Sequence, residues 1–486
     1  MIDTITIHHI NEVFVRIETS RGVCREISDF FSYFVPGYQH MPKFRNGWWD
    51  GKIRLFDMRK NILYKGLIKY LYAFAKERDY EVINNLETTT TIINPEHVDD
   101  FIDDLKLPFE ARGYQKDGFL RCVENERAVI LSPTASGKSL MIYMLMRWYN
   151  MKTLVVVPTI GLVQQMKGDF EDYGFRDGTL CITGKTDKKL WTGTVDSSSV
   201  VTTWQSIAKQ PSNWFDQFGV IIGDEAHHFK SDSLQKIMSK TLSTAYKFAF
   251  TGTLDGSETH RLMIESLFGS VFELTTSREL MDDGFIAPLD IKIILFKHKI
   301  IGLTSKSSYF DERDFIVDCD ARNRNIIKLA RKLKGNTIIL YSLVDRHGKV
   351  LYDILNDSKY EGRRFFISGG TDAEQREQVR VITEDETDAI IIASYGTFST
   401  GTNIKNLSNI IFASPHKGKI RVLQSIGRVL RLHDAKSKAR LFDLADDLRK
   451  TKRSKPNFTL KHLYERVKIY NEQQFDYQIF NIEVGE

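Results

Sequence analysis

The 486-residue sequence has little cysteine and little proline, only 4 and 10 residues respectively. Cys24, Cys122, Cys181 and Cys319 are far apart and form no CxxC pair, so neither a zinc site nor a disulfide framework is predicted. The expected state is four reduced thiols in a cytoplasm. The N-terminus lacks a charged-then-apolar signal segment, and no apolar run approaches the length of a membrane span.

Internal repeats, low-complexity tracts and a large net charge are also absent. The formal net charge of +5 is too small to indicate a nucleic-acid partner by itself, but its distribution is uneven. Residues 38–76 contain nine Lys or Arg and two acidic residues, and residues 416–470 contain sixteen and five. Two basic patches are expected for a protein that binds a polyanion, although each patch alone also fits a solvated basic face.

Strand and helix patterns divide the chain into four predicted parts. Residues 1–100 alternate strands with a helix and are predicted to form a small α+β nucleic-acid-binding domain. Residues 101–288 and 289–447 each alternate short apolar runs with amphipathic helices, which predicts two successive α/β domains with parallel sheets. Residues 448–486 are expected to form a basic helical C-terminal extension.

Residues 43–56, KFRNGWWDGKIRLF, place two tryptophans between basic residues. Asp50-Gly51 is a two-residue turn sequence, which predicts a β-hairpin with the tryptophans opposite the residues that follow the turn. Alternation would place one tryptophan in the core of the small domain and the other on the basic face, where it could stack on a base. Six residues are therefore expected to contact nucleic acid: Lys43, Arg45, Trp48, Trp49, Lys52 and Arg54.

Residues 128–146, AVILSPTASGKSLMIYMLM, predict an apolar strand, a loop and an apolar helix. The loop matches the P-loop pattern except that Ser132 replaces its first glycine. Such a loop directs backbone N–H groups toward phosphates, Lys138 would neutralise the β- and γ-phosphates, and Ser139 would bind Mg²⁺. A chance Gly-Lys-Ser in a turn would not require the two apolar elements. The predicted ATP-binding residues are Pro133, Thr134, Ala135, Ser136, Gly137, Lys138 and Ser139.

The sequence GVIIGDEAHH places two carboxylates directly after an apolar strand. Open α/β sheets bind ligands at that carboxyl edge. Asp224 could hold Mg²⁺ through water, and Glu225 could orient and deprotonate an attacking water. Two acids that cap a helix would be the alternative for either residue alone, but the nearby P-loop pattern favours the catalytic interpretation.

In IRVLQSIGRVLRL, Gln424, Arg428 and Arg431 are spaced i, i+4 and i+7, which predicts one face of a helix. Two guanidinium groups on a rigid helix suit the stabilisation of charge on a transferring γ-phosphate. The alternative is a surface helix with solvated arginines. The predicted catalytic residues are Lys138, Asp224, Glu225, Gln424, Arg428 and Arg431.

SPTASGKS and DEAH together resemble motifs I and II of superfamily 2 helicases, and further motifs follow in the family order over residues 105–447. The resemblance implies two tandem RecA-like domains, the cofactors ATP and Mg²⁺, and a nucleic-acid-dependent ATPase. ARGYQKDGF resembles the adenine-recognition element, which implies Arg112 and Gln115 near the base. SYGTFSTGTNIKNL resembles motif V, with Asn403 where many relatives have Asp, and Gly401 is assigned to the nucleotide.

The other motifs imply a nucleic-acid track. FTGTL resembles motif III, which implies that Thr251 and Thr253 couple the nucleotide site to the bound strand. VVVPTIGLVQQ and TTWQSI resemble motifs Ia and Ib. These motifs, with motif V, assign nucleic-acid contacts to Pro158, Thr159, Gln165, Thr203, Gln205 and Thr400.

The segments GYQHMPKFRNGWWDGKIRLFD, KGKIRVLQSIGRVLR and LFDLADD resemble the phage UvsW-type recombination helicases over nearly the whole chain. This resemblance implies an ATP-dependent DNA helicase that remodels forks, D-loops, R-loops and Holliday junctions by branch migration and reannealing, in recombination, repair and replication. It implies a monomer that binds branched DNA or single-strand/duplex junctions, with RNA–DNA hybrids as a further substrate, and no membrane. An RNA helicase or a duplex-translocase subunit would share the motor motifs. A non-catalytic binding module is disfavoured because the catalytic residues are all present.

Overall fold

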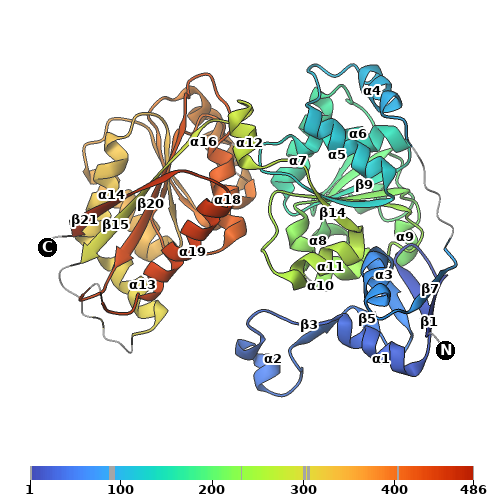
Figure 1. Ribbon diagram of the computed structural model, residues 1–486. Coiled ribbons are helices and arrows are strands. Elements are labelled where there is room, and N and C mark those ends of the chain that lie inside the picture. The colour runs from blue at the N-terminus through green and yellow to red at the C-terminus, as the bar shows by residue number, and fades with distance from the viewer. Residues whose placement is uncertain are drawn as a thin grey trace. The chain divides into compact units, whose positions relative to one another are not determined.

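A computed structural model describes residues 3–86, 93–230, 232–298, 303, 307–401, 404–451 and 453–484, with only the backbone of residues 230, 232, 373 and 399–401. The chain divides into two compact units (Figure 1): residues 1–132 with 137–274, and residues 133–136 with 275–486. The first unit contains the N-terminal domain and the first α/β domain, and the second contains the second α/β domain. No helix in the described part of the chain is long and apolar enough to span a membrane.

The N-terminal domain is a five-stranded sheet with two helices packed on it. Its two leading strands alternate, so that Ile5, Ile7, Val15 and Ile17 are fully buried while their neighbours face outward. The sheet order is β5-β6-β2-β1-β7, and β7 is parallel to β1 whereas the other pairs are antiparallel. The elements are β1 (Thr4–His9), β2 (Phe14–Glu18), α1 (Arg21–Phe30), β5 (Phe56–Asp57), β6 (Ile62–Tyr64), η2 (Lys65–Leu67), α3 (Ile68–Glu77) and β7 (Glu81–Asn84).

Residues 32–54, here called the arm, reach away from this sheet (Figure 1). The arm consists of β3 (Ser32–Phe34), η1 (Tyr38–His40), α2 (Pro42–Arg45) and β4 (Lys52–Arg54), and β4 is antiparallel to β3. The predicted hairpin turn at Asp50-Gly51 is therefore wrong.

Two local features account for the different structure of the arm. Pro42 occupies the first turn of α2, a position that proline favours, so the chain before the tryptophans coils instead of extending. Gly51 has a φ of 82°, and a Cβ there would lie 2.3 Å from the ring of Tyr38. The glycine thus permits aromatic packing and does not close a two-residue turn.

The first α/β domain contains a seven-stranded, wholly parallel sheet in the order β10-β11-β9-β12-β13-β8-β14. Its central strands are buried on both faces, as apolar runs such as TLVVV require. The strands are β8 (Arg127–Leu131), β9 (Thr153–Val157), β10 (Thr179–Ile182), β11 (Ser199–Thr203), β12 (Val220–Asp224), β13 (Tyr246–Thr251) and β14 (Ser270–Glu273). The helices are α4 (Pro95–Asp104), α5 (Gly113–Glu124), α6 (Lys138–Tyr149), α7 (Ile160–Asp172), η3 (Lys188–Leu190), α8 (Trp204–Ile207), α9 (Ser212–Phe215), η4 (Ala226–Lys230), α10 (Asp232–Met238) and α11 (Glu258–Phe268).

The second α/β domain repeats this architecture with a parallel sheet in the order β17-β18-β16-β19-β20-β15-β21. The strands are β15 (Leu289–His298), β16 (Thr337–Tyr341), β17 (Arg364–Ile367), β18 (Ile390–Ser394), β19 (Asn409–Phe412), β20 (Ala439–Asp447) and β21 (Tyr477–Val484). The helices are α12 (Ser277–Asp282), α13 (Tyr309–Asp318), α14 (Asp320–Lys332), η5 (Val344–Lys349), α15 (Val350–Asp357), α16 (Ala373–Asp385), α17 (Tyr395–Gly401), α18 (Lys419–Val429) and α19 (Phe458–Glu472). The two parallel sheets confirm the predicted fold class.

The C-terminal segment differs from the expected helical extension. Its helix, α19, is followed by β21, which pairs in parallel with β15 and forms an edge of the second sheet. Arg466 of α19 is fully buried, and its Nε donates to the carboxylate of Asp443 at 2.9 Å. The segment is therefore an integral part of the second α/β domain.

A buried charge network joins the N-terminal domain to the first parallel sheet. The Glu12 carboxylate accepts hydrogen bonds from Lys65 Nζ at 2.7 Å and from Arg127 Nη2 at 3.0 Å. Its main-chain oxygen accepts one from Lys247 Nζ at 2.6 Å. Burial raises the pKa of Glu12, but the bonds and charges of Lys65 and Arg127 outweigh burial and lower it to about 2. Removal of the carboxylate would leave buried cations without compensation.

We expect Glu12→Gln to lower the free energy of unfolding of the first unit by about 3 kcal/mol at pH 7, because a shift of one pKa unit corresponds to about 1.4 kcal/mol. The carboxylate's contribution is present above its unfolded pKa of 4.5 and is lost as the pH falls through about 2. Urea denaturation at pH 7 and at progressively lower pH should show the difference shrink in acid. Glu18→Gln, at an exposed glutamate, is the control; equal stability of the two variants at pH 7 would contradict the network's role.

Candidate functional site

The P-loop connects β8 to α6 in the first α/β domain. Gly137 caps α6 with a φ of 77°, and α6 begins at Lys138, whose Nζ lies 3.2 Å from the main-chain oxygen of Ser132. Ser132 is fully buried, so the loop accommodates a side chain where the P-loop pattern has glycine. Helix α6 thus begins directly after the loop that the sequence predicts to bind phosphate.

The predicted adenine element lies beside this loop. Gln115 is buried in the first turn of α5, and a Cβ on Gly137 would lie 2.3 Å from its Nε2 atom. Its Oε1 accepts a hydrogen bond from the backbone N–H of Arg112 at 2.9 Å, and the Arg112 guanidinium donates to the hydroxyl of Tyr114 at 2.9 Å. The structure therefore places the side-chain amide of Gln115 against Gly137 of the P-loop.

Asp224 is the last residue of β12, and its side chain is 8% exposed. Burial, followed by the charge of Glu225, raises the pKa of Asp224 to about 7. Its Oδ1 atom has no hydrogen-bond partner among the described residues. A buried carboxylate oxygen with no hydrogen-bond donor is costly unless a cation or water compensates it.

These oxygens fit Mg²⁺. Ser139 Oγ, which shares a 2.9 Å hydrogen bond with the hydroxyl of Tyr173, would add a second oxygen to that of Asp224. Among the described residues, no group of three or more His, Cys, Asp or Glu side chains is arranged to hold a metal ion. Mg²⁺ needs none, because it is typically held by one or two protein oxygens together with waters and substrate phosphates.

His227 connects the residues after β12 to the end of β13. Its Nδ1 lies 3.1 Å from Thr251 Oγ1, and both residues are buried. Thr251 Oγ1 in turn lies 3.2 Å from the main-chain oxygen of Thr253. Thr251 of FTGTL is therefore in hydrogen-bond contact with the DEAH sequence, and Thr253 contacts Thr251. His227 was not among the predicted site residues, although its place in DEAH could have suggested it.

Four of the predicted track residues line one groove of about 370 Å³ in the first unit. Thr159 and Thr203 precede α7 and α8 at the carboxyl ends of β9 and β11, where helix N-termini present free N–H groups. Gln165 lies further along α7 and does not line the groove. The lining residues are Pro158, Thr159, Ile160, Gly184, Thr203, Gln205 and Ser206; Gly184 belongs to no predicted motif, and Ser206 belongs to TTWQSI but was not a predicted contact.

In the second unit, α18 carries Gln424 and Arg428 but ends at Val429. Leu430 caps the helix, so Arg431 lies just beyond it. The prediction that Arg431 shares one helical face with Gln424 and Arg428 is therefore wrong. The Arg428 guanidinium lies 5.8 Å from the ring centre of Phe398 on α17. Thr400 and Gly401 lie in the last turn of α17, where only the backbone is described, and Asn403 lies outside the described residues.

Lys436 holds the end of α18, a role that the sequence did not suggest. It is buried, and its Nζ donates to the main-chain oxygens of Val429 at 3.0 Å, Leu407 at 3.1 Å and Lys405 at 3.0 Å. Burial lowers its pKa to about 8. An ammonium at helix C-terminal carbonyls is favourable, and here it fixes the chain that leads to Arg431.

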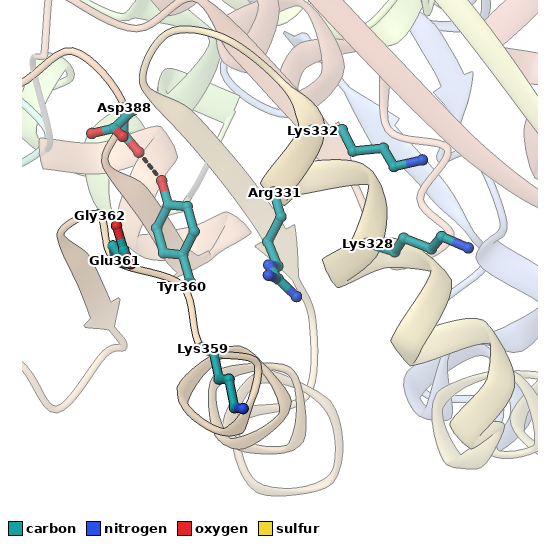
Figure 2. Close-up of a pocket in the computed structure, with 8 residues that line it drawn as sticks. All are labelled: Lys328, Arg331, Lys332, Lys359, Tyr360, Glu361, Gly362 and Asp388. Atoms are coloured by element: carbon teal, nitrogen blue, oxygen red, sulfur yellow. Dashed lines mark hydrogen bonds between the residues drawn. The ribbon is translucent and has the colours of Figure 1, made fainter.

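A separate hollow of about 460 Å³ lies in the second unit (Figure 2). The hydroxyl of Tyr360 donates to the main-chain oxygen of Asp388 at its edge. None of the predicted site residues lines it, because it is formed by residues that precede the amino ends of β16, β17 and β18. Its lining residues are Lys328, Arg331, Lys332, Lys359, Tyr360, Glu361, Gly362 and Asp388.

Two parallel-sheet domains, with a P-loop and a DEAH sequence at one sheet edge, define the chain as a helicase-type ATPase of superfamily 2. Family models agree along the chain: the DNA helicase UvsW N-terminal model matches residues 4–85, the type III restriction enzyme res subunit model residues 87–256, and the helicase conserved C-terminal domain model residues 321–433. The ATP-dependent DNA helicase uvsW of Enterobacteria phage T4 is 33% identical over 97% of this chain and 98% of its own length. The chain belongs to the UvsW family.

Other similarities agree with this family. A crystal structure of T4 UvsW aligns with a TM-score of 0.52 and 30% identity over 99% of this chain and 100% of that one. The DNA 3′-5′ translocase XPB2 of Sulfurisphaera tokodaii is 23% identical over 68% of this chain and 82% of its own length. The type ISP restriction-modification enzyme LlaBIII, at 14% identity and a TM-score of 0.57 over 86% of this chain and 34% of that one, shares the fold.

We expect Lys138→Ala to lower ATP turnover at least about 100-fold, because it removes the cation proposed to stabilise the β- and γ-phosphates. Strand displacement should be lost, while DNA binding should be largely unchanged because the groove and the arm do not include Lys138. Turnover, displacement and fluorescence anisotropy with labelled DNA measure the three effects. Lys189→Ala, at an exposed lysine of η3, is the control; full displacement by the Lys138 variant would overturn the assignment.

Proposed function

We propose that the chain is an ATP-dependent helicase that unwinds and remodels branched DNA: forks, D-loops, R-loops and Holliday junctions. The observation that carries this proposal is the arm, which presents exposed basic and aromatic residues from a domain fixed to the first α/β domain. A branch offers a second nucleic-acid segment that a surface apart from the track can hold. The T4 relative, an ATP-dependent DNA helicase, supports DNA as the substrate.

In the proposed ATPase site, the P-loop backbone and Lys138 bind the phosphates, and Arg112 and Gln115 lie near the adenine. Mg²⁺, held by Asp224 and Ser139, would neutralise phosphate charge when bound. Glu225 would orient the attacking water and accept its proton. Three residues of the second unit are assigned to the charge that develops on the γ-phosphate: Gln424, Arg428 and Arg431.

The proposed track for one strand is the groove at the carboxyl ends of β9 and β11. The side chain of Thr159 caps α7 by accepting from the N–H of Leu162 at 3.4 Å, which orients the helix N-terminus. Such N-termini bind phosphate without reading the base. Thr203, whose Oγ1 lies 3.0 Å from Ser206 Oγ, would add a hydroxyl contact. Gln165 and Thr400 are also assigned to contact with the strand, and Thr251 and Thr253 are assigned to coupling the nucleotide site to it.

The six predicted contact residues of the arm fall into two groups. Lys43, Arg45 and Trp48 are exposed, Trp48 by 79%, and the two cations form no ion pair with any described residue. The other three are engaged within the arm. Trp49 Nε1 donates to the main-chain oxygen of Lys52 at 2.8 Å, Lys52 Nζ lies 4.9 Å from the ring centre of Phe34, and Arg54 pairs with Asp50. We therefore assign phosphate contacts to the first group's cations and base stacking to Trp48.

Three further assignments belong to this proposal. RNA–DNA hybrids would be substrates because phosphate contacts and stacking do not depend on the sugar of the partner strand. A monomer is proposed because each predicted site residue has its place in one chain. A reducing host cytoplasm is proposed because all four cysteines are free thiols.

The experiment that tests the function compares ATP-dependent unwinding of a fork, a four-way junction, an R-loop and a linear duplex by the purified protein. Branched substrates should be processed at least about tenfold faster than the linear duplex, because only they offer a second segment to the arm. Equal rates on all four would reject branch specificity. ATP turnover on duplex DNA without strand separation would indicate a duplex translocase, and equal stimulation by RNA would indicate an RNA helicase.

For the arm, we expect Lys43→Ala/Arg45→Ala to reduce the slope of log Kobs against log[salt] by about 1.8, the change for two lost phosphate contacts on duplex DNA. Trp48→Ala should weaken binding by about 1–3 kcal/mol without changing that slope, because stacking releases no counterions. Fluorescence anisotropy with fork DNA at several salt concentrations measures both effects. Arg59→Ala/Lys60→Ala removes the same charge between β5 and β6 as a control; an equal slope in the two double variants would exclude a specific role for the arm.

A further inference from the structure

Helix α11 belongs to two hydrophobic cores at once. Leu262 and Met263 pack into the core of the N-terminal domain, and they are 1% and 6% exposed. Ile264, Leu267 and Phe268 pack into the core of the first α/β domain. The helix cannot shift without disturbing the packing of both domains, because close-packed interiors transmit displacement.

Polar contacts fix the C-terminal half of α11 to the N-terminal domain. Glu265 is fully buried, its carboxylate accepts from Lys69 Nζ at 2.8 Å, and it also accepts from the hydroxyl of Tyr70. The backbones of η2 and α11 approach so closely that a Cβ on Gly66 would lie 2.1 Å from the main-chain oxygen of Glu265. Near the other end of the helix, Thr259 Oγ1 lies 3.4 Å from the main-chain oxygen of Phe34, in the first strand of the arm.

The N-terminal half of α11 is fixed to the DEAH sequence by His260, which is 3% exposed. The backbone N–H of Asp255 lies 3.1 Å and its carboxylate 3.0 Å from His260 Nδ1, and the carbonyl that faces Nε2 can only accept, so Nε2 carries a proton. That Nε2 lies 3.2 Å from the main-chain oxygen of His227 and donates to it. The Asp255 carboxylate accepts from the backbone and hydroxyl of Ser257, the residue that caps α11.

The contact with His227 leads directly to the ATPase residues. His227 lies two residues after Glu225 and contacts Thr251 through its ring and His260 through its main chain. A continuous path of contacts therefore runs from Lys69 and Tyr70, through the buried Glu265 and His260 of α11, to the DEAH sequence. All of these residues belong to the first unit.

We propose that α11 couples DNA contact by the N-terminal domain to ATP turnover, with His260 as a positioning residue that acts through the main chain of His227. DNA held by the arm would bias the position of α11, and His260 would transmit this bias to the loop that carries Glu225. The inference rests on the proposed contact between the N-terminal domain and DNA. It adds a coupling route to the one that the resemblance of FTGTL to motif III implies.

The test compares His260→Gln with His260→Asn in the full chain. The Gln amide places an N–H donor near the position of His Nε2, whereas the Asn amide reaches only the position of Nδ1. His260→Gln should retain DNA stimulation of ATP turnover within about twofold, and His260→Asn should lose at least about fivefold, a typical coupling between two sites. The readouts are kcat and KM for ATP with and without fork DNA, and DNA affinity by fluorescence anisotropy, which should match in the two variants.

Tyr70→Phe tests the other end of the path, because it removes one donor to Glu265 without changing the shape of the ring. It should lower DNA stimulation, and the Tyr70→Phe/His260→Asn double variant should be no worse than His260→Asn, since one break is enough to interrupt a single path. Multiplicative losses would overturn the proposal.

Three further outcomes separate coupling from folding and from the proposed function. Equal losses of stimulation and of thermal stability in the Gln and Asn variants would show that His260 is only structural. Full stimulation in His260→Asn would reject the coupling path alone. A wild-type protein whose ATP turnover ignores DNA would instead reject the DNA-dependent function on which the path rests.

Discussion

The parallel direction of every strand in the two seven-stranded sheets is the constraint on which the functional arrangement depends. In such a sheet all carboxyl ends lie at one edge, so residues far apart in the sequence converge there. The P-loop follows β8, Thr159 follows β9, and Asp224 ends β12. Arg127 and Lys247 stand at the opposite edge, at the starts of β8 and β13, and there they hold Glu12 of the N-terminal domain. One edge of the sheet thus carries the residues proposed to bind ATP and nucleic acid, and the opposite edge carries the contacts with the N-terminal domain.

Buried charges follow the same division. Glu12 at the attachment edge of the first sheet is compensated by two cations. Asp224 at the other edge has an oxygen without a hydrogen-bond partner among the described residues, and its pKa is raised. Paired charges specify how elements dock. An uncompensated carboxylate stores an unfavourable energy that a bound cation can relieve.

Periodicity and motif spacing predicted the central strands and the residues at their ends, because buried parallel strands are continuous apolar runs. The short strands β10 and β14 and the edge strand β21 were not predicted. Thr179–Ile182 and Ser270–Glu273 have four residues each, too few for a clear period. The β21 sequence, YQIFNIEV, has exposed side chains at six consecutive positions, so it lacks the alternation that marks a half-buried strand.

The arm and the site contacts show a second limit of prediction from sequence, because some residues gain their roles only from tertiary contacts. The ring of Tyr38 determines why Gly51 is needed, and nothing local to Asp50-Gly51 reveals a ring thirteen residues earlier. Lys436 and His260 likewise gain their roles from carbonyl groups that the fold brings to them. A lysine or histidine alone in a sequence carries no record of such acceptors. Motif spacing therefore identifies residues that contact a ligand more readily than residues that position those contacts.

The shared helix α11 constrains how the N-terminal domain can contribute to catalysis. Its two apolar faces belong to separate cores, so a displacement of one domain against the other would expose apolar surface on both. Glu265 adds a buried carboxylate whose donors come from the N-terminal domain. Within the first unit, nucleic acid bound to the arm would accordingly keep a fixed place relative to the DEAH sequence. Its effect on turnover would then come from small shifts of a pre-organised site and not from a large movement of the domain.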